Sequence, residues 1–134
     1  MTETKRMLLM TNIYCTYLND ISIMFINEDG VFYSYIKEKT ICLPQNTLSN
    51  PTEWNIFAFL HEIGHIITNK ESMKRYYQEY LATQWAIEES KRRGFKVPKR
   101  IINIYQNYIW DWRERSIKLK GKNVCSKEDL VLIA

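Results

Sequence analysis

The chain of 134 residues is 46% hydrophobic and carries a net charge of +4, which predicts one globular domain over residues 1–134 and argues against disorder. No apolar run reaches the roughly 20 residues of a membrane-spanning helix, and the first residues lack the apolar core of a signal peptide. The three cysteines form no CxxC pair, which is typical of thiols in a reducing compartment. We therefore expect a cytoplasmic protein that makes no contact with a membrane.

The first third of the chain predicts a small β-sheet. Residues 7–18 are apolar and rich in tyrosine, a pattern that fits either a helix or a strand. Three segments rich in strand-forming residues follow, at residues 21–26, 31–36 and 41–43. The Asp-Gly pair at the end of residues 27–30 is a strong hairpin signal, and residues 37–40 fit a second turn. We expect a three-stranded antiparallel meander that ends at Pro44.

The rest of the chain predicts three helices. The first spans residues 51–67, with Asn50 as N-cap, Pro51 in the first helical position and Glu53 completing a capping box. The second and third helices are expected over residues 72–93 and 98–120, each ended by a glycine, and the tail over residues 124–134 fits a strand or a helical turn. The fold class is therefore α+β, with a small sheet followed by three helices.

The most informative motif is His61-Glu62-Ile63-Gly64-His65, which contains both histidines of the chain. On a helix with about 3.6 residues per turn, His61 and His65 point the same way, about 6 Å apart along the axis. They can hold one metal ion, and Glu62 is placed to accept a proton from a water on that ion. The alternative is a pair of satisfied core histidines, but their coincidence with Glu62 on a capped helix favours the metal. Gly64 weakens the helix by about 1 kcal/mol, which indicates close approach of another backbone or of substrate.

A catalytic zinc ion usually takes three protein ligands, and the chain has no third histidine. The acidic candidates downstream are Glu71, Glu79, Glu88 and Glu89. We favour Glu79, because the small residues that follow it allow two helices to approach closely, and because a divalent ion offsets the cost of burying a carboxylate. The alternative places Glu79 on the exposed face of an amphipathic helix.

Two motifs resemble those of the ImmA/IrrE-type metallopeptidases. The segment His61–His65, preceded by Phe57, resembles the HE-x-GH helix of that family, and residues 79–86 resemble its E-x-x-A-x-x-F-A segment, with Trp85 where phenylalanine is common. The resemblance covers roughly residues 41–90. It implies a zincin-like minimal domain of the gluzincin kind, with His61, His65 and Glu79 as zinc ligands and Glu62 as general base. Family members often lie beside helix-turn-helix repressors in phages and other mobile elements, and some cleave them.

The expected activity is therefore zinc-dependent hydrolysis of a peptide bond in a protein or peptide substrate, such as a helix-turn-helix repressor. Tyr76 or Tyr80, near Glu79 in sequence, is a candidate donor to the oxyanion. The strand over residues 41–43 leads directly into the active helix, so we expect its edge to bind an extended substrate by β-augmentation. The same ligand set would also accept manganese or cobalt, although two imidazoles and a carboxylate suit zinc well.

A second interpretation is a binding module. Residues 91–122 contain eleven Lys or Arg residues and two acidic residues, a balance that suits nucleic acid or an acidic regulatory protein as partner. The simpler explanation, which we prefer, is a solvated helix face. A third interpretation keeps the same zinc site in a toxin-like protease directed at a host protein.

Overall fold

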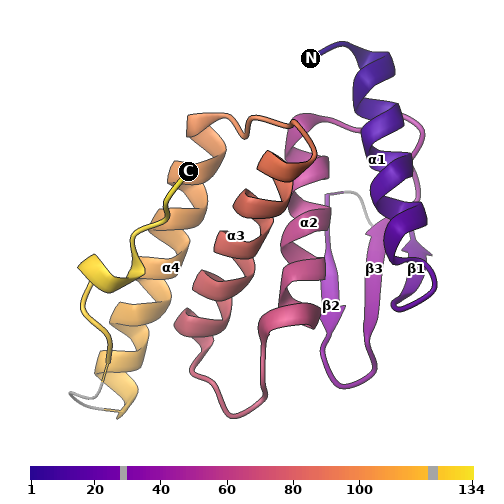
Figure 1. The fold of residues 1–134 in the computed structure, drawn as a ribbon. Helices are drawn as coiled ribbons and strands as arrows, with labels where there is room; N and C mark the ends of the chain where they lie inside the picture. The colour runs from indigo at the N-terminus through magenta and orange to yellow at the C-terminus, as the bar shows by residue number, and fades with distance from the viewer. Residues whose placement is uncertain (28–29, 121–123) are drawn as a thin grey trace.

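The computed structural model describes residues 1–27, 30–120 and 124–134 (Figure 1). A helix precedes a small sheet, and three longer helices and a single 3₁₀ turn follow it. In chain order the elements are α1 (Glu3–Tyr17), β1 (Ser22–Ile26), β2 (Tyr33–Tyr35), β3 (Thr40–Pro44), α2 (Glu53–Thr68), α3 (Arg75–Arg92), α4 (Lys99–Lys120) and η1 (Glu128–Leu130). The α+β class is as expected.

The sheet is mixed, and the expected antiparallel meander is wrong. The strand order is β1-β3-β2, with β3 parallel to β1 and antiparallel to β2. The reason lies in burial: residues 41–44 of β3 are all buried, as a central strand requires, whereas β1 and β2 expose residues along their length. The hairpin expected around residues 27–30 does not pair its flanking strands with each other, and Glu28 and Asp29 lie outside the described residues. The hairpin that forms joins β2 to β3.

This topology overturns the expectation that residues 41–43 form a free edge. Ile41 pairs with Ile23 on one side and with Ser34 on the other, so both sides of β3 are occupied. An incoming peptide strand therefore has no place beside β3. The two edges of the sheet are β1 and β2, and it is β2 that packs beside α2.

The helices differ from expectation mainly at their ends. The ambiguous segment over residues 7–18 belongs to helix α1, capped by Thr2. Helix α2 begins later than expected: Thr52 is its N-cap and Asn55 completes the capping box, in place of Asn50 and Glu53. The tail forms the single turn η1, and the expected stop at Gly121 lies outside the described residues.

Helix α2 is the central element of the core. Its residues from Ile56 to His65 are all buried, so the helix is covered on every side rather than along one stripe. The sheet and α1 lie on one side of it and α3 on the other, with α4 beyond α3 (Figure 1). The motif of the two histidines therefore lies in the interior, where charges require partners. Within the described part of the chain, no helix is long and apolar enough to cross a membrane.

Candidate metal centre

Three side chains from two helices converge on one point. His61 and His65 project from α2, and Glu79 projects from the first turns of α3; all three are buried. Glu79 Oε2 lies 2.9 Å from His61 Nε2 and 3.1 Å from His65 Nε2, and the two Nε2 atoms are 3.0 Å apart. Ligands of a tetrahedral zinc ion, at about 2.0–2.1 Å from the metal, lie about 3.3–3.4 Å from one another. Small outward shifts of the three side chains would therefore place these atoms at the spacing of ligands around one zinc ion.

The outer nitrogen of each imidazole is bound so that the inner nitrogen carries a lone pair. The Thr83 hydroxyl donates to the carbonyl of Glu79 (2.7 Å), which leaves its oxygen to accept a hydrogen bond from His61 Nδ1–H (3.1 Å). Asn69 donates through Nδ2 to Thr68 Oγ1 and to the carbonyl of Gln78, so its Oδ1 faces His65 Nδ1–H and accepts from it. Partners of this kind orient metal-binding histidines.

The protons on the two Nδ1 atoms decide whether a metal fits between the side chains. With both Nδ1 atoms protonated, three acceptor atoms, two Nε2 and one carboxylate oxygen, face one another at about hydrogen-bond distance. Three buried lone pairs repel unless a cation or a proton lies among them. Two imidazoles and a carboxylate form the donor set of catalytic zinc sites. The residues present therefore fit a zinc ion.

Gly64 explains how α3 brings its carboxylate so close. A Cβ atom at Gly64 would lie 2.5 Å from the carbonyl oxygen of Ala82 and 3.0 Å from its Cα. The two helices touch backbone to backbone at this point, as the glycine in the motif predicts. Glu79 lies one turn before Ala82 on α3, so the contact sets its distance from the histidines.

When the imidazoles also carry a proton on Nε2, their charges and that of Glu79 stabilise one another. Burial alone would raise the pKa of Glu79, but the hydrogen bonds and charges of His61 and His65 outweigh it and hold the pKa well below its usual range. Burial would likewise lower the pKa of His65, yet the hydrogen bond and charge of Glu79 raise it above 6.5. Arg75 donates from Nε to the second oxygen of Glu79 at 3.0 Å. Glu79 is therefore ionised and has one oxygen directed at the histidines.

Glu62 lies beside the cluster without joining it. Its Oε1 is 3.4 Å from the Ser34 hydroxyl on β2. Its Oε2 is buried and has no hydrogen-bond partner among the described residues. Burial raises the pKa of Glu62, although His61 and His65 oppose the shift. A partly unsatisfied carboxylate with a raised pKa is suited to accepting and returning a proton.

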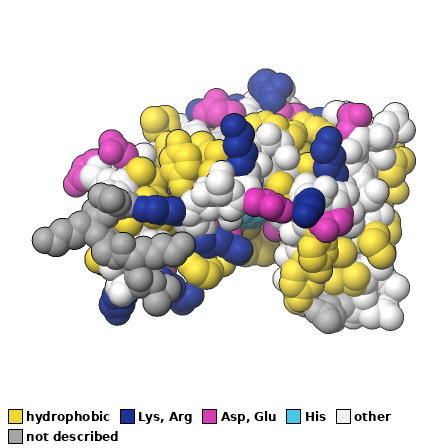
Figure 2. Space-filling model, turned by 90° about the horizontal axis from the view of Figure 1, so that it is seen from below, with side chains coloured by type: hydrophobic (Ala, Val, Ile, Leu, Met, Phe, Trp, Pro, Cys, Tyr) yellow, Lys and Arg dark blue, Asp and Glu magenta, His cyan; other side chains and the backbone are white. Residues whose placement is uncertain are grey.

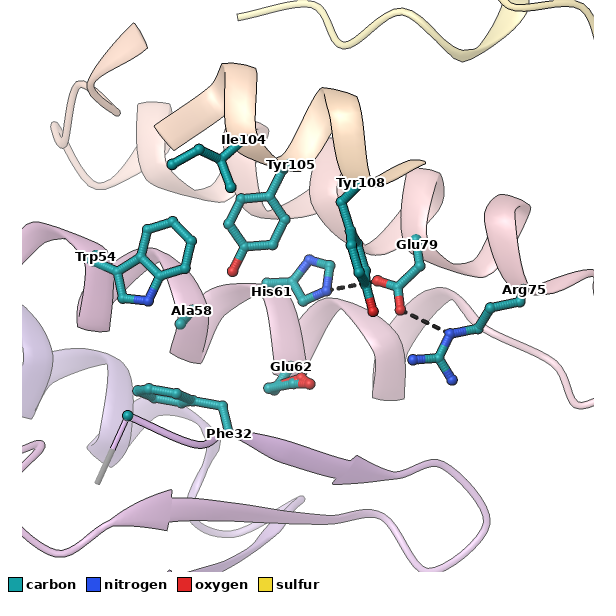
Figure 3. A pocket seen from close by; sticks show the side chains of 11 residues that line it. Phe32, Trp54, Ala58, His61, Glu62, Arg75, Glu79, Ile104, Tyr105 and Tyr108 are labelled. Atoms are coloured by element: carbon teal, nitrogen blue, oxygen red, sulfur yellow. Dashed lines mark hydrogen bonds and ion pairs between the residues drawn. The ribbon is translucent and has the colours of Figure 1, made fainter. Parts of the chain in front are cut away.

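The cluster opens into a pocket of about 360 Å³, within the range of ligand-binding pockets. Figure 2 shows the notch in the surface, with a histidine side chain visible at its floor between acidic and basic side chains. Figure 3 shows the side chains that line it, which come from α2, α3, α4 and the segment before β2. The lining comprises Gly30, Phe32, Trp54, Ala58, His61, Glu62, Arg75, Glu79, Ile104, Tyr105 and Tyr108.

The expected oxyanion donors do not lie in this lining. Tyr76 is buried, and its hydroxyl oxygen accepts a hydrogen bond from the backbone N–H of Cys125 at 3.0 Å. The ring of Tyr80 stacks on that of Tyr77. Tyr76 lies three residues before Glu79 in sequence and Tyr80 one residue after it, yet neither contributes to the described pocket wall. The role of Tyr76 and Tyr80 as oxyanion donors therefore finds no support in this pocket wall and stays a prediction.

The tyrosines in the described pocket wall are Tyr105 and Tyr108, both on α4. The ring of Tyr105 lies 4.8 Å from that of His61, and both tyrosines line the pocket (Figure 3). Burial, with the charges of Glu62 and Glu79, raises the pKa of Tyr105, so its hydroxyl keeps its proton. Their spacing of three places them on one helix face, but nothing local in the sequence indicates which neighbour that face meets.

The basic segment over residues 91–122 is partly neutralised. Arg92 and Arg93 both pair with the buried Glu89, and Arg113 binds Glu114 and the carbonyl of Cys125. Arg92 and Arg93 therefore compensate a buried carboxylate near the end of α3, and Arg113 joins α4 to the tail. Whether the rest of the segment is a solvated face or a binding surface stays a prediction.

Comparisons with models of protein families, with curated proteins and with solved structures find no match for this chain. Membership of the ImmA/IrrE-type metallopeptidases, which its two motifs resemble, is accordingly a proposal.

Proposed function

We propose that the protein is a zinc-dependent metallopeptidase of the ImmA/IrrE type that hydrolyses a peptide bond in a protein substrate. The observation that carries the proposal is the convergence of three buried acceptor atoms from His61, His65 and Glu79, with both imidazoles held in the metal-binding tautomer. Glu62 at the side of this cluster and the open pocket above it add the two further requirements of a hydrolase, a base and access for substrate. A helix-turn-helix repressor is the substrate that the resemblance favours.

When bound, zinc supplies Lewis-acid chemistry, lowering the pKa of a water to about 7 and polarising the scissile carbonyl. Glu62 accepts the proton of the attacking water and returns it to the leaving amine, for which its raised pKa suits it. The hydroxyl of Tyr108 or Tyr105 donates to the developing oxyanion from the opposite wall of the pocket. Thr83 and Asn69 keep the imidazoles in orientation throughout.

We place the substrate backbone alongside β2 rather than β3. Strand β2 is an edge strand, and Ser34 in it lies within 3.4 Å of Glu62. An extended peptide added to this edge would run beside the general base, with main-chain hydrogen bonds supplying affinity.

Metal analysis and peptide cleavage test the proposal together. The purified protein is expected to hold one zinc ion per chain, and Glu79→Ala to lose it. Incubation of zinc-loaded protein with a proteome-derived peptide library should yield new peptide termini by mass spectrometry. The Glu62→Gln variant should retain zinc and yield none. A metal-free wild-type protein, or equal cleavage by Glu62→Gln, would overturn the proposal.

A further inference from the structure

The two ends of the pocket differ in chemistry. One end is apolar and aromatic, formed by Phe32, Trp54, Ala58 and Ile104, and the other end holds the guanidinium of Arg75. In Figure 3 the two groups lie on opposite sides of His61 and Glu62. A peptide whose scissile bond reaches Glu62 therefore extends toward an apolar wall in one direction and toward a cation in the other.

Arg75 is fixed in place yet has donors to spare. Its Nε donates to Glu79 Oε1 at 3.0 Å, and its guanidinium carbon lies 5.0 Å from the centre of the Trp112 ring. The side chain is 52% exposed, and its bond to Glu79 occupies Nε alone, so the two Nη groups are not used by that carboxylate. A guanidinium held by Nε and by an aromatic ring is preorganised to receive a second carboxylate on its Nη groups.

The charge of Arg75 favours the same ligand. Arg75 is the one Lys or Arg residue among the described residues that line the pocket, and Glu79 binds its Nε and not its Nη groups. A guanidinium at this place attracts an anionic ligand group.

We propose that Arg75 selects substrates by binding a carboxylate on one side of the scissile bond, while the aromatic end of the pocket takes an apolar side chain on the other. This inference rests on the proposed peptidase function and specifies the substrate class. The carboxylate is either an acidic side chain or the carboxyl terminus of the substrate; the chemistry at Arg75 is the same.

A binding experiment separates this role from mere positioning of Glu79. The probes are fluorescent heptapeptide amides with one phenylalanine and, one to three positions away on either side, aspartate or asparagine. A further arm carries a free carboxyl terminus and no aspartate. Binding to zinc-loaded Glu62→Gln protein is followed by anisotropy, so that no cleavage interferes. Charge-assisted hydrogen bonds of about 1.5–3 kcal/mol predict at least tenfold tighter binding of the carboxylate probe.

Two variants complete the design. Arg75→Gln should reduce the carboxylate preference below threefold. Arg115→Gln should keep it, although Arg115 also lies over the Trp112 ring, at 4.9 Å, because it is not part of the described pocket wall. A preference in the free-terminus arm alone assigns the carboxylate to the substrate terminus. A preference below threefold in every arm, or one that survives Arg75→Gln, overturns the proposal.

The two proposals fail separately. Cleavage of the library by wild-type protein without a carboxylate preference would overturn the role of Arg75 and leave the peptidase standing. A carboxylate preference that depends on Arg75, in a protein that cleaves nothing, would support the binding role and overturn the peptidase.

Discussion

Replacement of Gly64 by alanine tests whether the backbone contact between α2 and α3 builds the metal centre. The added Cβ would lie 2.5 Å from the Ala82 carbonyl oxygen, against at least 3.4 Å in an ordinary contact, so the helices must separate by nearly 1 Å. Overpacking of this kind typically costs about 1–3 kcal/mol, and alanine returns about 1 kcal/mol through helix propensity. We expect the free energy of unfolding to fall by about 1 kcal/mol net.

The effect on zinc should be larger than the effect on stability. Metal–ligand bonds tolerate deviations of only about 0.2 Å, and Glu79 moves with α3 because it lies one turn before Ala82. We therefore expect Gly64→Ala to weaken zinc binding by at least tenfold. Urea unfolding of the metal-free protein measures the first quantity, and competition with a chromophoric chelator measures the second.

Gly94 provides the matched control. It has a φ of +73°, and an added Cβ atom would meet nothing within 4 Å, so alanine there strains the backbone without any steric contact. Gly94→Ala should lower stability by about 1 kcal/mol and leave zinc affinity unchanged. If Gly64→Ala were instead more stable than wild type and bound zinc equally well, the helix contact would have no part in positioning Glu79.

Three further predictions concern the surroundings of the metal. Thr83→Val, which removes the acceptor of His61 Nδ1–H, should weaken zinc binding about tenfold or more by chelator competition, whereas Thr83→Ser should not. Because the pKa of His65 is raised above 6.5, the metal-free protein should lose stability as the pH rises from 6.5 through that pKa. The zinc-loaded protein, in which zinc displaces the proton, should gain stability as the pH rises toward 6.5 and then level off; thermal unfolding with and without chelator should therefore diverge as the pH rises, and parallel curves would contradict the assignment. Tyr108→Phe or Tyr105→Phe, whichever removes the oxyanion donor, should lower kcat about 10²-fold or more with zinc content intact, and full activity in both variants would exclude this wall of the pocket.

The parts of the structure that local periodicity determines could be predicted from the sequence. The helix that carries His61 and His65 follows from the spacing of its apolar residues, and the contact at Gly64 follows from the cost of a glycine inside a helix. The observed cap of that helix lies two residues beyond the predicted one, because Asn50 and Thr52 both offer suitable side chains and only the extended backbone at Thr52 decides between them.

Sheet topology depends on burial that no single strand reveals. The Asp-Gly pair before β2 is a strong local signal for a hairpin, yet the strands on either side of it do not pair. An unbroken apolar run indicates a strand covered on both faces, but both β1, with residues 23–26, and β3, with residues 41–43, carry such a run. Only the structure separates them, because β3 is buried while Met24 and Phe25 of β1 are exposed.

The pocket wall formed by α4 could not be predicted, because it depends on how much of the α4 surface is covered by its neighbours. The apolar stripe of α4 divides in the structure: Ile101 and Ile109 are buried, whereas Ile104 is 54% exposed and Tyr108 is 42% exposed, and both line the pocket. A helix buries only as much of its stripe as its neighbour can cover. An apolar stripe wider than that contact leaves a hydrophobic surface, and such surfaces are typically binding sites. The sequence contains two signs of this wall, the excess width of the apolar stripe and two tyrosines three residues apart. They predict the pocket wall only when the partner helix is known.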